Sequence, residues 1–402
     1  MATNLKKIQV AELRLGMFVH AFDSSWLSNP FWRSKILLDD TAKLNAALAS
    51  GIAECWIDAE RGADAAPTAP TAPAAPPAPA AAAAPQSDFE RELVRASALC
   101  AQARGATEAM FREARLGNAV DVARCAELVD ELAGSVMRNP GALISLARLK
   151  TKDDYTYMHS VAVCALMVGL GQNLGLDAAA CREAGLAGLL HDVGKSGIPL
   201  DILNHPGKLS EDEFAQVRNH PRHGYDLLCE GGSVSAAVAD VCLHHHEKFA
   251  GGGYPDGLAG TDISLLARMG AVCDVYDAIT SNRPYKSGWD PSESVARMLE
   301  WQGHFDPAVL AAFVKLLGIY PVGTLVRLKS QRLAMVIEQN KAALTKPVVR
   351  VFYAIGAKAR IVPERLDLAA AGADGIVGRE PREHWDFDDL ERMWAGAAAP
   401  RR

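Results

Sequence analysis

Residues 191–199 read HDVGKSGIP, which sets a histidine and an aspartate side by side shortly before a glycine. The apolar residues that precede them recur at spacings of three and four, a pattern that predicts a helix ending at this point. Adjacent helical residues point about 100° apart, so both side chains can turn toward one site best at a helix end. A carboxylate placed there can bridge two metal ions, because each of its oxygens can bind one. Alone, however, a His-Asp pair is weak evidence for a metal site.

The surrounding sequence supplies further candidate ligands. Eight of the eleven histidines lie between His159 and His246. In chain order the cluster consists of His159, His191-Asp192, His220, the run His244-His245-His246-Glu247, and Asp274 with Asp277 one helical turn later. Each motif alone would more often be a core or surface feature, but five of them at helix-compatible intervals predict a metal centre. Nitrogen and carboxylate ligands without sulfur favour iron, manganese or another octahedral first-row ion over structural zinc.

The chain is predicted to be mainly helical around this cluster. We expect a small α+β domain at 1–61, an Ala/Pro-rich linker at 62–86, connecting helices at 87–144 and an all-helical catalytic domain at 145–318. The linker follows from recurrent proline, which prevents a buried helix and a membrane span alike. Residues 319–402 are expected to form a small β appendage, with strands near 324–330, 333–339 and 347–354, and a frayed tail after Trp385.

Composition and charge argue against several classes of protein. The chain has 402 residues and a formal net charge of −6, which argues against a binder of nucleic-acid polymers. The N-terminus lacks the apolar core of a signal peptide, and the longest apolar run, 161–170, is about half a membrane span. The eight cysteines are scattered without a Cys-x-x-Cys pair, which favours reduced core residues. We therefore expect a cytoplasmic protein that does not enter the membrane.

Four motifs in a fixed order resemble those of a known family. They are HDVGKSGIP (191–199), HPRHG (220–224), HHEKFAGGGYPDGL (245–258) and DVYDAITSNRPYK (274–286), with YTYMHS (155–160) upstream. Together they are similar to the HD-GYP subfamily of the HD phosphohydrolases, over about residues 145–318. The stretch KIQVAELRLGMFV near the N-terminus resembles a domain of unknown function often joined to HD-GYP domains. The resemblance implies a metal-dependent enzyme that hydrolyses cyclic di-GMP, a bacterial second messenger, to pGpG or GMP.

The resemblance also implies roles for individual residues. Carried over by motif, the ligands of two divalent ions, iron or manganese, are His159, His191, Asp192, His220, His245, His246 and Asp274, with Asp192 bridging. Lys195 is similar to the family lysine that positions the attacking water or stabilises developing charge, so Lys195 and Asp192 are the expected catalytic residues. Arg283 and Lys286 match a pair that contacts phosphate, and Asp277 and Tyr285 are expected at the substrate as well. The GYP loop, 251–255, is where family members are proposed to contact diguanylate cyclase (GGDEF) domains.

Two positions depart from the family pattern. Tyr155 stands where some members have a glutamate that helps to bind a third metal, so we expect two ions. Ala250 replaces a usual aspartate before the GYP loop, which puts loop geometry or partner binding in doubt more than metal binding. His20, His205, His223, His304 and His384 are expected to be structural or surface residues, although His223 could support a ligand from behind.

Two alternative functions therefore stay open. One is an HD hydrolase that acts on another cyclic dinucleotide or nucleotide. The other is a non-catalytic receptor or interaction module, which would bind cyclic di-GMP or cyclase domains without turnover. A homodimer paired along the helix expected at 87–116 is a further hypothesis.

Overall fold

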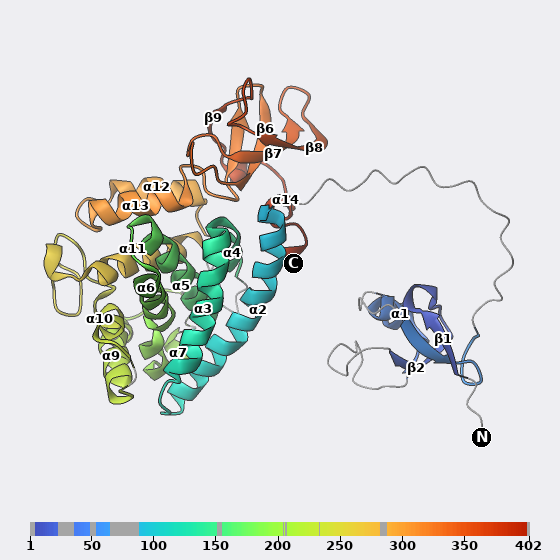
Figure 1. Cartoon of the computed structure of the whole chain (residues 1–402), viewed down its shortest axis with the longest axis horizontal. Coiled ribbons are helices and arrows are strands. Elements are labelled where there is room, and N and C mark those ends of the chain that lie inside the picture. Colours follow the sequence, from blue (N-terminus) through green and yellow to red (C-terminus); the bar gives the residue numbers. More distant parts are fainter. Residues whose placement is uncertain are drawn as a thin grey trace. The chain divides into compact units, whose positions relative to one another are not determined.

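Figure 1 shows the computed structural model, which describes residues 5–22, 36–48, 54–64, 88–150, 155–203, 205, 207–232, 234–281 and 288–399. The chain divides into two compact units, Met1–Ala83 and Ala84–Arg402. Most of the linker expected at 62–86 lies outside the described residues. Each unit has its own hydrophobic core, and the candidate ligands all belong to the second unit.

The first unit is a small antiparallel sheet with one helix. Its elements are β1 (Leu5–Gln9), β2 (Phe18–Phe22), β3 (Ile36–Leu37), α1 (Thr41–Leu48) and β4 (Glu54–Asp58). The strand order is β1-β4-β2-β3, so the strand predicted to close the unit lies between two others. Cys55 and Ile57 alternate along β4 and are both buried, as the period of two in a strand requires. These observations agree with the expected small β-containing unit.

The second unit begins with a body of helices, as the sequence predicts. They are α2 (Asp88–Arg115), α3 (Val122–Arg138), α4 (Pro140–Ala147), α5 (Tyr155–Asn173), α6 (Ala178–Leu190), α7 (Leu200–Leu203), α8 (Glu211–Arg218), α9 (His220–Glu230), α10 (Ala236–His244), α11 (Leu265–Thr280), α12 (Pro291–Glu300) and α13 (Pro307–Leu317). The apolar run 161–170 lies within α5 and is buried throughout. A helix that is apolar on every side belongs in a core, and α5 packs against α2, α4, α6, α11 and α13. None of the described helices has the length and apolar character needed to cross a membrane.

Two glycines bring α5 and α6 unusually close together. A Cβ atom on Gly188 would lie 3.0 Å from main-chain atoms of Cys164, and one on Gly185 would lie 2.7 Å from a methyl group of Val168. Larger residues at these positions would force the two helices apart. The close packing matters because α5 carries His159 and α6 leads directly into His191.

The chain ends in a five-stranded antiparallel sheet with a short helix. The strands are β5 (Leu325–Leu328), β6 (Arg332–Glu338), β7 (Val348–Ala354), β8 (Ala359–Asp367) and β9 (Ile376–Arg379), in the order β8-β7-β6-β5-β9. The first three strands and the β appendage were predicted, whereas β8 and β9 were not. Figure 1 shows this sheet beyond the helical body, near α12 and α13.

The expectation of a frayed tail after Trp385 is wrong. Residues Leu390–Ala395 form a helix, α14, which packs against β6. Leu390 and Trp394 are 4% and 3% exposed, and both belong to the main hydrophobic core. Their spacing of four puts them on one helical face, and that apolar stripe is sufficient to dock the short helix. Arg350 of β7 also donates a hydrogen bond to the carbonyl of Met393.

Candidate active site

The predicted ligands occupy helix ends and the interior of two buried helices. His191 is the C-cap of α6, and Asp192 follows it directly before a 3-10 turn, η3 (Val193–Gly197). His245 is the C-cap of α10. Both pairs thus lie at helix ends, as predicted, where consecutive side chains can face one centre. His159 and Asp274 project from within α5 and α11.

Close contact between two glycines places the second motif beside the first. A Cβ atom on Gly194 would lie 2.0 Å from the carbonyl oxygen of His220 and 2.5 Å from the nitrogen of Gly224. Any side chain at Gly194 would therefore push η3 away from α9. Because this contact is possible, His220 lies next to Asp192. His223 supports it from behind, since its Nδ1 donates to the Gly194 carbonyl at 2.9 Å.

A first ligand group contains His159, His191 and Asp192, whose ligand atoms all lie within 4.8 Å of one another. Asp192 Oδ2 is 3.5 Å from His159 Nε2 and 3.3 Å from His191 Nε2. Asp274 joins this group, because its Oδ1 is 2.9 Å from His159 Nε2. All four residues are buried.

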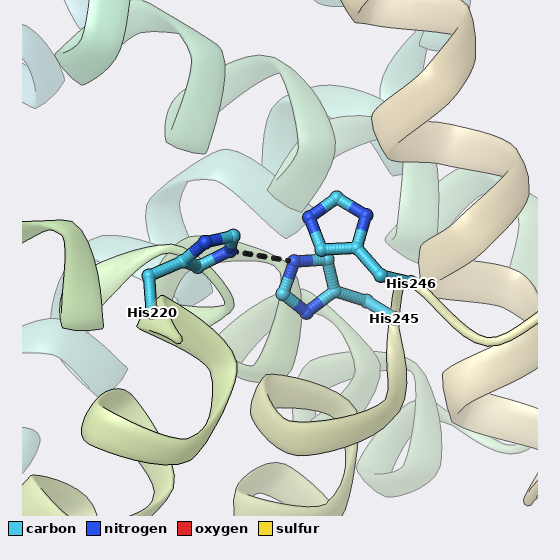
Figure 2. A group of neighbouring side chains, drawn as sticks. All are labelled: His220, His245 and His246. Atoms are coloured by element: carbon cyan, nitrogen blue, oxygen red, sulfur yellow. Dashed lines mark hydrogen bonds between the residues drawn. The ribbon is translucent and has the colours of Figure 1, made fainter. Parts of the chain in front are cut away.

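A second ligand group contains His220, His245 and His246, again within 4.8 Å of one another. Figure 2 shows the three imidazole rings gathered at one point, with His220 on a different segment from the two consecutive histidines. The Nε2 atoms of His220 and His245 face each other at 3.3 Å. The ring centroids of His245 and His246 are 4.1 Å apart.

Asp192 lies between the two groups. Its Oδ2 faces the first group, whereas its Oδ1 is 3.2 Å from His220 Nε2 and 3.9 Å from His245 Nε2. Asp274 also turns one oxygen to each side, with Oδ2 at 3.8 Å from His246 Nδ1. One carboxylate oxygen for each group is the arrangement that a bridging ligand requires.

Hydrogen bonds behind the histidines fix which ring nitrogen faces the centre. The Nδ1 atoms of His191, His220 and His245 lie 2.8, 2.7 and 3.0 Å from the main-chain carbonyls of Gly188, Val217 and Cys242. A carbonyl only accepts, so each Nδ1 is the donor and each neutral ring presents a lone pair at Nε2.

The resulting donor set fits divalent metal ions. Two lone pairs, on His220 and His245, point at each other, which is unfavourable unless a cation or proton lies near them. His191 Nε2 and Asp192 Oδ1 are also buried without a hydrogen-bond partner among the described residues. Buried polar atoms normally have a partner, and here a metal ion would supply it.

The structure places Asp277 behind His159. This residue is 2% exposed, and its Oδ2 accepts a hydrogen bond from His159 Nδ1 at 2.6 Å. The same oxygen forms an ion pair with Lys150, which in turn donates to Ser281 Oγ at 3.0 Å. Asp277 is therefore engaged behind His159 and is not among the residues that line the cavity described below, and its expected contact with the substrate stays a prediction. It orients His159, as a carboxylate commonly does for a metal-binding histidine.

The pKa of His159 in the first group and the pKa values of His245 and His246 in the second are shifted in opposite directions. Burial alone would lower the pKa of His159, but hydrogen bonds with Asp274 and Asp277 outweigh it and the pKa is raised. Burial lowers the pKa of His246 to about 3, and it lowers that of His245 well below the ordinary value. Burial opposes charge on Asp192 as well, yet the neighbouring His191 and Lys195 hold its pKa well below the usual range.

A cavity of about 450 Å³ opens onto both groups. Lys195 lines it and remains partly exposed, with Nζ 2.5 Å from Asp192 Oδ2. Helix α11 contributes apolar residues to the lining together with Asp274, and other segments contribute polar residues; the lining includes Lys248, Tyr254, Ala271, Val275, Ala278, Ile279 and His304. The cavity therefore combines a polar centre with an apolar surface, as small-molecule sites generally do.

Several residues of this site were not predicted. Lys150 is fully buried, and nothing in the surrounding LARLK sequence distinguishes it from a surface lysine. His304, expected to be structural or superficial, lines the cavity because the 301–305 turn lies beside the GYP loop, where Phe249 N donates to its carbonyl at 3.0 Å. Tyr254 stacks on His246 with ring centroids 4.7 Å apart.

Glu247 anchors the GYP loop. Its Oε1 accepts hydrogen bonds from the main-chain nitrogens of Asp256 and Gly257 at 2.8 and 2.9 Å. Ala250, the departure from the family pattern, is exposed and does not line the cavity; its nitrogen donates to the carbonyl of Gly303 at 2.8 Å. Ala250 thus lies outside both ligand groups.

Some predicted residues lie outside the described part of the chain. These are Arg283, Tyr285 and Lys286, so their roles at the substrate stay predictions. Tyr155 begins α5, but its side chain also lies outside the described residues. The expectation of two rather than three ions thus stays a prediction.

Comparison with known proteins agrees with this geometry. The HD domain family matches residues 138–309, and a domain of unknown function, DUF3391, matches residues 5–125. The chain is 54% identical, over 399 residues, to "Cyclic di-GMP phosphodiesterase PA4108" of Pseudomonas aeruginosa, which covers 98% of this chain and 96% of that protein.

Two further relatives match a little over a third of the chain. "Cyclic di-GMP phosphodiesterase response regulator RpfG" of Xanthomonas campestris is 43% identical over 150 residues, 36% of this chain and 39% of that protein. "3'3'-cGAMP-specific phosphodiesterase 1" of Vibrio cholerae is 35% identical over 153 residues, 38% of this chain and 35% of that protein. With a relative matched along nearly its whole length and a paired ligand site at the centre of its HD domain, the chain belongs to the HD-domain cyclic di-GMP phosphodiesterases.

Proposed function

We propose that the protein hydrolyses cyclic di-GMP to pGpG or GMP at a centre of two divalent metal ions, iron or manganese. The observation that carries the proposal is the position of Asp192, which turns one oxygen to each of two ligand groups. Paired divalent ions supply a water-derived nucleophile and stabilise the oxygens of an in-line phosphoryl displacement. The substrate follows from the relative that matches along nearly the whole chain.

Each ligand group would hold one ion. His159, His191 and Asp274 would serve the first, His220, His245 and His246 the second, and Asp192 both. The main-chain carbonyls and Asp277 keep the histidine rings in place, so that little reorganisation is needed when an ion binds.

Lys195 is our proposed catalytic cation. Its ammonium group is held 2.5 Å from Asp192 Oδ2 and is still partly open to the cavity. From there it can donate a hydrogen bond to the attacking water or to a phosphoryl oxygen, where charge develops. Lys248 also lines the cavity and adds positive charge to a chain whose formal net charge is −6.

Substrate contacts beyond the cavity belong to the proposal as well. Arg283 and Lys286 would hold the phosphates, because a guanidinium fork and an ammonium group suit such oxygens. Tyr285 would lie beside them. We further propose a cytoplasmic enzyme whose GYP loop receives diguanylate cyclase domains, and a homodimer formed along α2.

A turnover assay with metal analysis tests the proposal. The full-length protein, purified without oxygen, should contain close to two iron or manganese ions per chain and should convert cyclic di-GMP to a linear product. Loss of activity on chelation, with recovery on adding back either ion, would support the assignment. Tight binding of cyclic di-GMP to a fully loaded protein without turnover would instead identify a receptor.

A second substrate is worth the same assay. The Vibrio cholerae relative that matches 38% of this chain is named as specific for 3'3'-cGAMP. Its ligand geometry need not differ, because both substrates are cyclic dinucleotides joined by the same linkage. We expect kcat/KM to be higher for cyclic di-GMP, and the reverse order would overturn the substrate assignment while leaving the chemistry intact.

A further inference from the structure

The active-site cavity continues beyond the ligand groups along one face of α11. Residues three and four apart on a helix share a face, and those of α11 that line the cavity are Ala271, Asp274, Val275, Ala278 and Ile279. Asp274 belongs to the ligand groups, whereas Ala278 and Ile279 lie one helical turn further along. Both are partly exposed, as is Val275, so this wall keeps accessible apolar surface. The cavity thus has an apolar surface next to the candidate metal centre.

An aromatic ring lines the same cavity from a different segment. His304 is partly exposed, and neither of its ring nitrogens forms a hydrogen bond within the part of the chain that the structure describes. The rings of Trp301 and Phe305 pack beside it, with centroids 5.7 and 4.4 Å away. A Cβ atom on Gly303 would lie 2.7 Å from that of Ala250, so glycine is what lets this turn approach the GYP loop. The imidazole of His304 is thus held at the cavity, with polar atoms that no described residue uses.

Lys248 brings a positive charge near this ring. It is exposed and lines the cavity, and its ammonium group forms no ion pair or hydrogen bond with any described residue. Burial lowers the pKa of His304, and the charge of Lys248 lowers it further, so the two side chains are near enough to interact. Lys195, which also lines the cavity, is instead held by Asp192. Lys248 can therefore turn its donors to a ligand without breaking an existing contact.

We propose that Lys248 and His304 form a subsite for one guanine base of the substrate. The base packs between the His304 ring and the apolar face of α11, and the Lys248 ammonium donates to its O6 and N7 atoms. Guanine presents two acceptors there, whereas adenine presents an amino group in place of O6. Every base has a π-face to stack, so His304 contributes affinity and Lys248 contributes selectivity. The subsite rests on the proposed function and adds to it the residues that recognise guanine.

A base subsite on one side of the metal centre makes the enzyme distinguish two linkages. 3'3'-cGAMP contains one guanine and one adenine, and its two phosphodiesters give different linear products, pGpA and pApG. With guanine in the subsite, one particular phosphodiester lies at the ligand groups. The full-length, metal-loaded protein should therefore form one product in about 5- to 150-fold excess, the discrimination that a specific contact with a base provides.

Two kinds of variant separate selectivity from affinity. Lys248→Met keeps the length of the side chain and removes its charge and donors, so it should bring the two products of 3'3'-cGAMP to nearly equal amounts. His304→Ala should raise KM for both cyclic dinucleotides about 5- to 150-fold through lost stacking and largely keep the product ratio, whereas His304→Phe should restore KM. Metal content should not change in any of them. Lys315→Met, exposed on α13 and outside the cavity, is the matched control for charge.

Binding gives a readout that needs no turnover. By calorimetry, the metal-loaded parent should bind GMP about 5- to 150-fold more tightly than AMP, and Lys248→Met should remove the difference. Equal weakening of GMP and AMP in this variant would mean that Lys248 contacts phosphate, and the guanine subsite would be wrong. A mixture of pGpA and pApG from the parent, or an unchanged product ratio in Lys248→Met, would overturn the subsite as well.

The subsite and the proposed function fail separately. If the parent prefers GMP through Lys248 but never turns over cyclic di-GMP, the proposed function fails and the subsite stands. If it turns over cyclic di-GMP and binds GMP and AMP equally, the subsite fails and the proposed function stands. Should the parent not hydrolyse 3'3'-cGAMP, the preference for GMP over AMP decides between these outcomes.

Discussion

The two ligand groups differ in the charge that surrounds them, although each brings three side chains together. The first group has Asp192 within it, Asp274 against His159, and behind that histidine the buried pair of Asp277 and Lys150. The second group consists of three imidazoles, with the pKa values of His245 and His246 depressed by burial. The first group thus contains carboxylates and is held in place by the Asp277–Lys150 pair behind His159. The second group consists of imidazole rings and receives negative charge from the oxygen that Asp192 turns toward it.

The largest effect should come from the residue that the groups share. Asp192→Ala should abolish turnover and strip both ions, because two cations would lose the negative charge between them and repel each other. Metal content and circular dichroism check this, with Asp226→Ala on the exposed face of α9 as a matched control. Near-normal activity with two ions in Asp192→Ala would show that the groups are independent and that Asp192 is not their bridge.

The two ligand groups should not bind the substrate by themselves, because binding should also need Arg283 and Lys286. Changing Arg283 and Lys286 together to alanine should raise KM about 10²- to 10⁴-fold, since each charge-assisted contact contributes about 1.5–3 kcal/mol. Metal content should not change. Lys195→Ala should instead lower kcat while substrate still binds, as expected of a group that acts in the transition state.

Steady-state kinetics with metal analysis separates these outcomes. Arg297→Ala is a suitable control for the double variant, because Arg297 forms an exposed pair with Glu293 outside the cavity. A double variant that binds and hydrolyses cyclic di-GMP like the parent would make Arg283 and Lys286 ordinary surface charges.

The Asp277–Lys150 pair behind His159 makes it possible to weaken the first ligand group without changing the second. Lys150→Met removes the cation that balances Asp277, so it should reduce the affinity of the first group for metal about 10- to 100-fold and spare the second. Metal titration of the apoprotein measures this as a split between two binding steps. Lys150→Met should also lower the free energy of unfolding, because it leaves the buried Asp277 carboxylate without its cation. Adding Asp277→Asn to this variant should recover part of that lost stability, because it removes the unpaired charge.

Equal weakening of both binding steps in Lys150→Met would contradict the assignment. It would indicate a general loss of structure instead of a specific effect on His159. Thermal unfolding of the same variant in the absence of metal distinguishes the two explanations.

The smallest expected effect is a difference between His159 and His246 in how each changes the stability of the metal-free protein with pH. The raised pKa of His159 means that its contribution to stability is full below about pH 6.5 and is lost as pH rises through the folded-state value. The pKa of His246, about 3, has the opposite effect: the unfolded chain takes up a proton first, so stability falls as pH drops below about 6.5. His159→Gln should therefore cost more stability at pH 6 than at pH 9, and His246→Gln less at pH 5 than at pH 8.

Thermal unfolding of the metal-free variants between pH 5 and 9 measures this difference as shifts of a few degrees. Parallel pH profiles for the two variants would mean that the groups do not differ in proton affinity. Metal must be absent, because bound ions would hold both rings unprotonated.

The sequence predicted where the candidate ligands lie on the helices far better than it predicted the residues that hold those ligands in place. His191, Asp192 and His245 could be placed at helix ends because a glycine or a change of pattern follows each motif. The mainly helical fold and the C-terminal strands followed from the periodicity of apolar residues. These features depend on neighbours in the chain, which a single sequence displays directly.

The residues that hold the candidate ligands in place depend on contacts between distant segments of the chain. Lys150 meets Asp277 across 127 positions of sequence, and nothing local separates it from an exposed lysine. The family resemblance placed Asp277 at the substrate, whereas the packing of α5 against α11 brings it to His159. The α14 helix was missed for a related reason, because its short apolar stripe has meaning only beside β6.

The order of the ligand groups along the chain has a consequence for synthesis. His159, His191 and Asp192 of the first group are present once residue 192 has been made, and α5 and α6, whose glycines allow close packing, bring the two histidines together, whereas Asp274 is added later. The second group follows only at residue 246. The carboxylate that joins the first group is thus translated only after all three histidines of the second group. Asp274, which turns one oxygen to each group, is therefore the last residue of the centre to be synthesised.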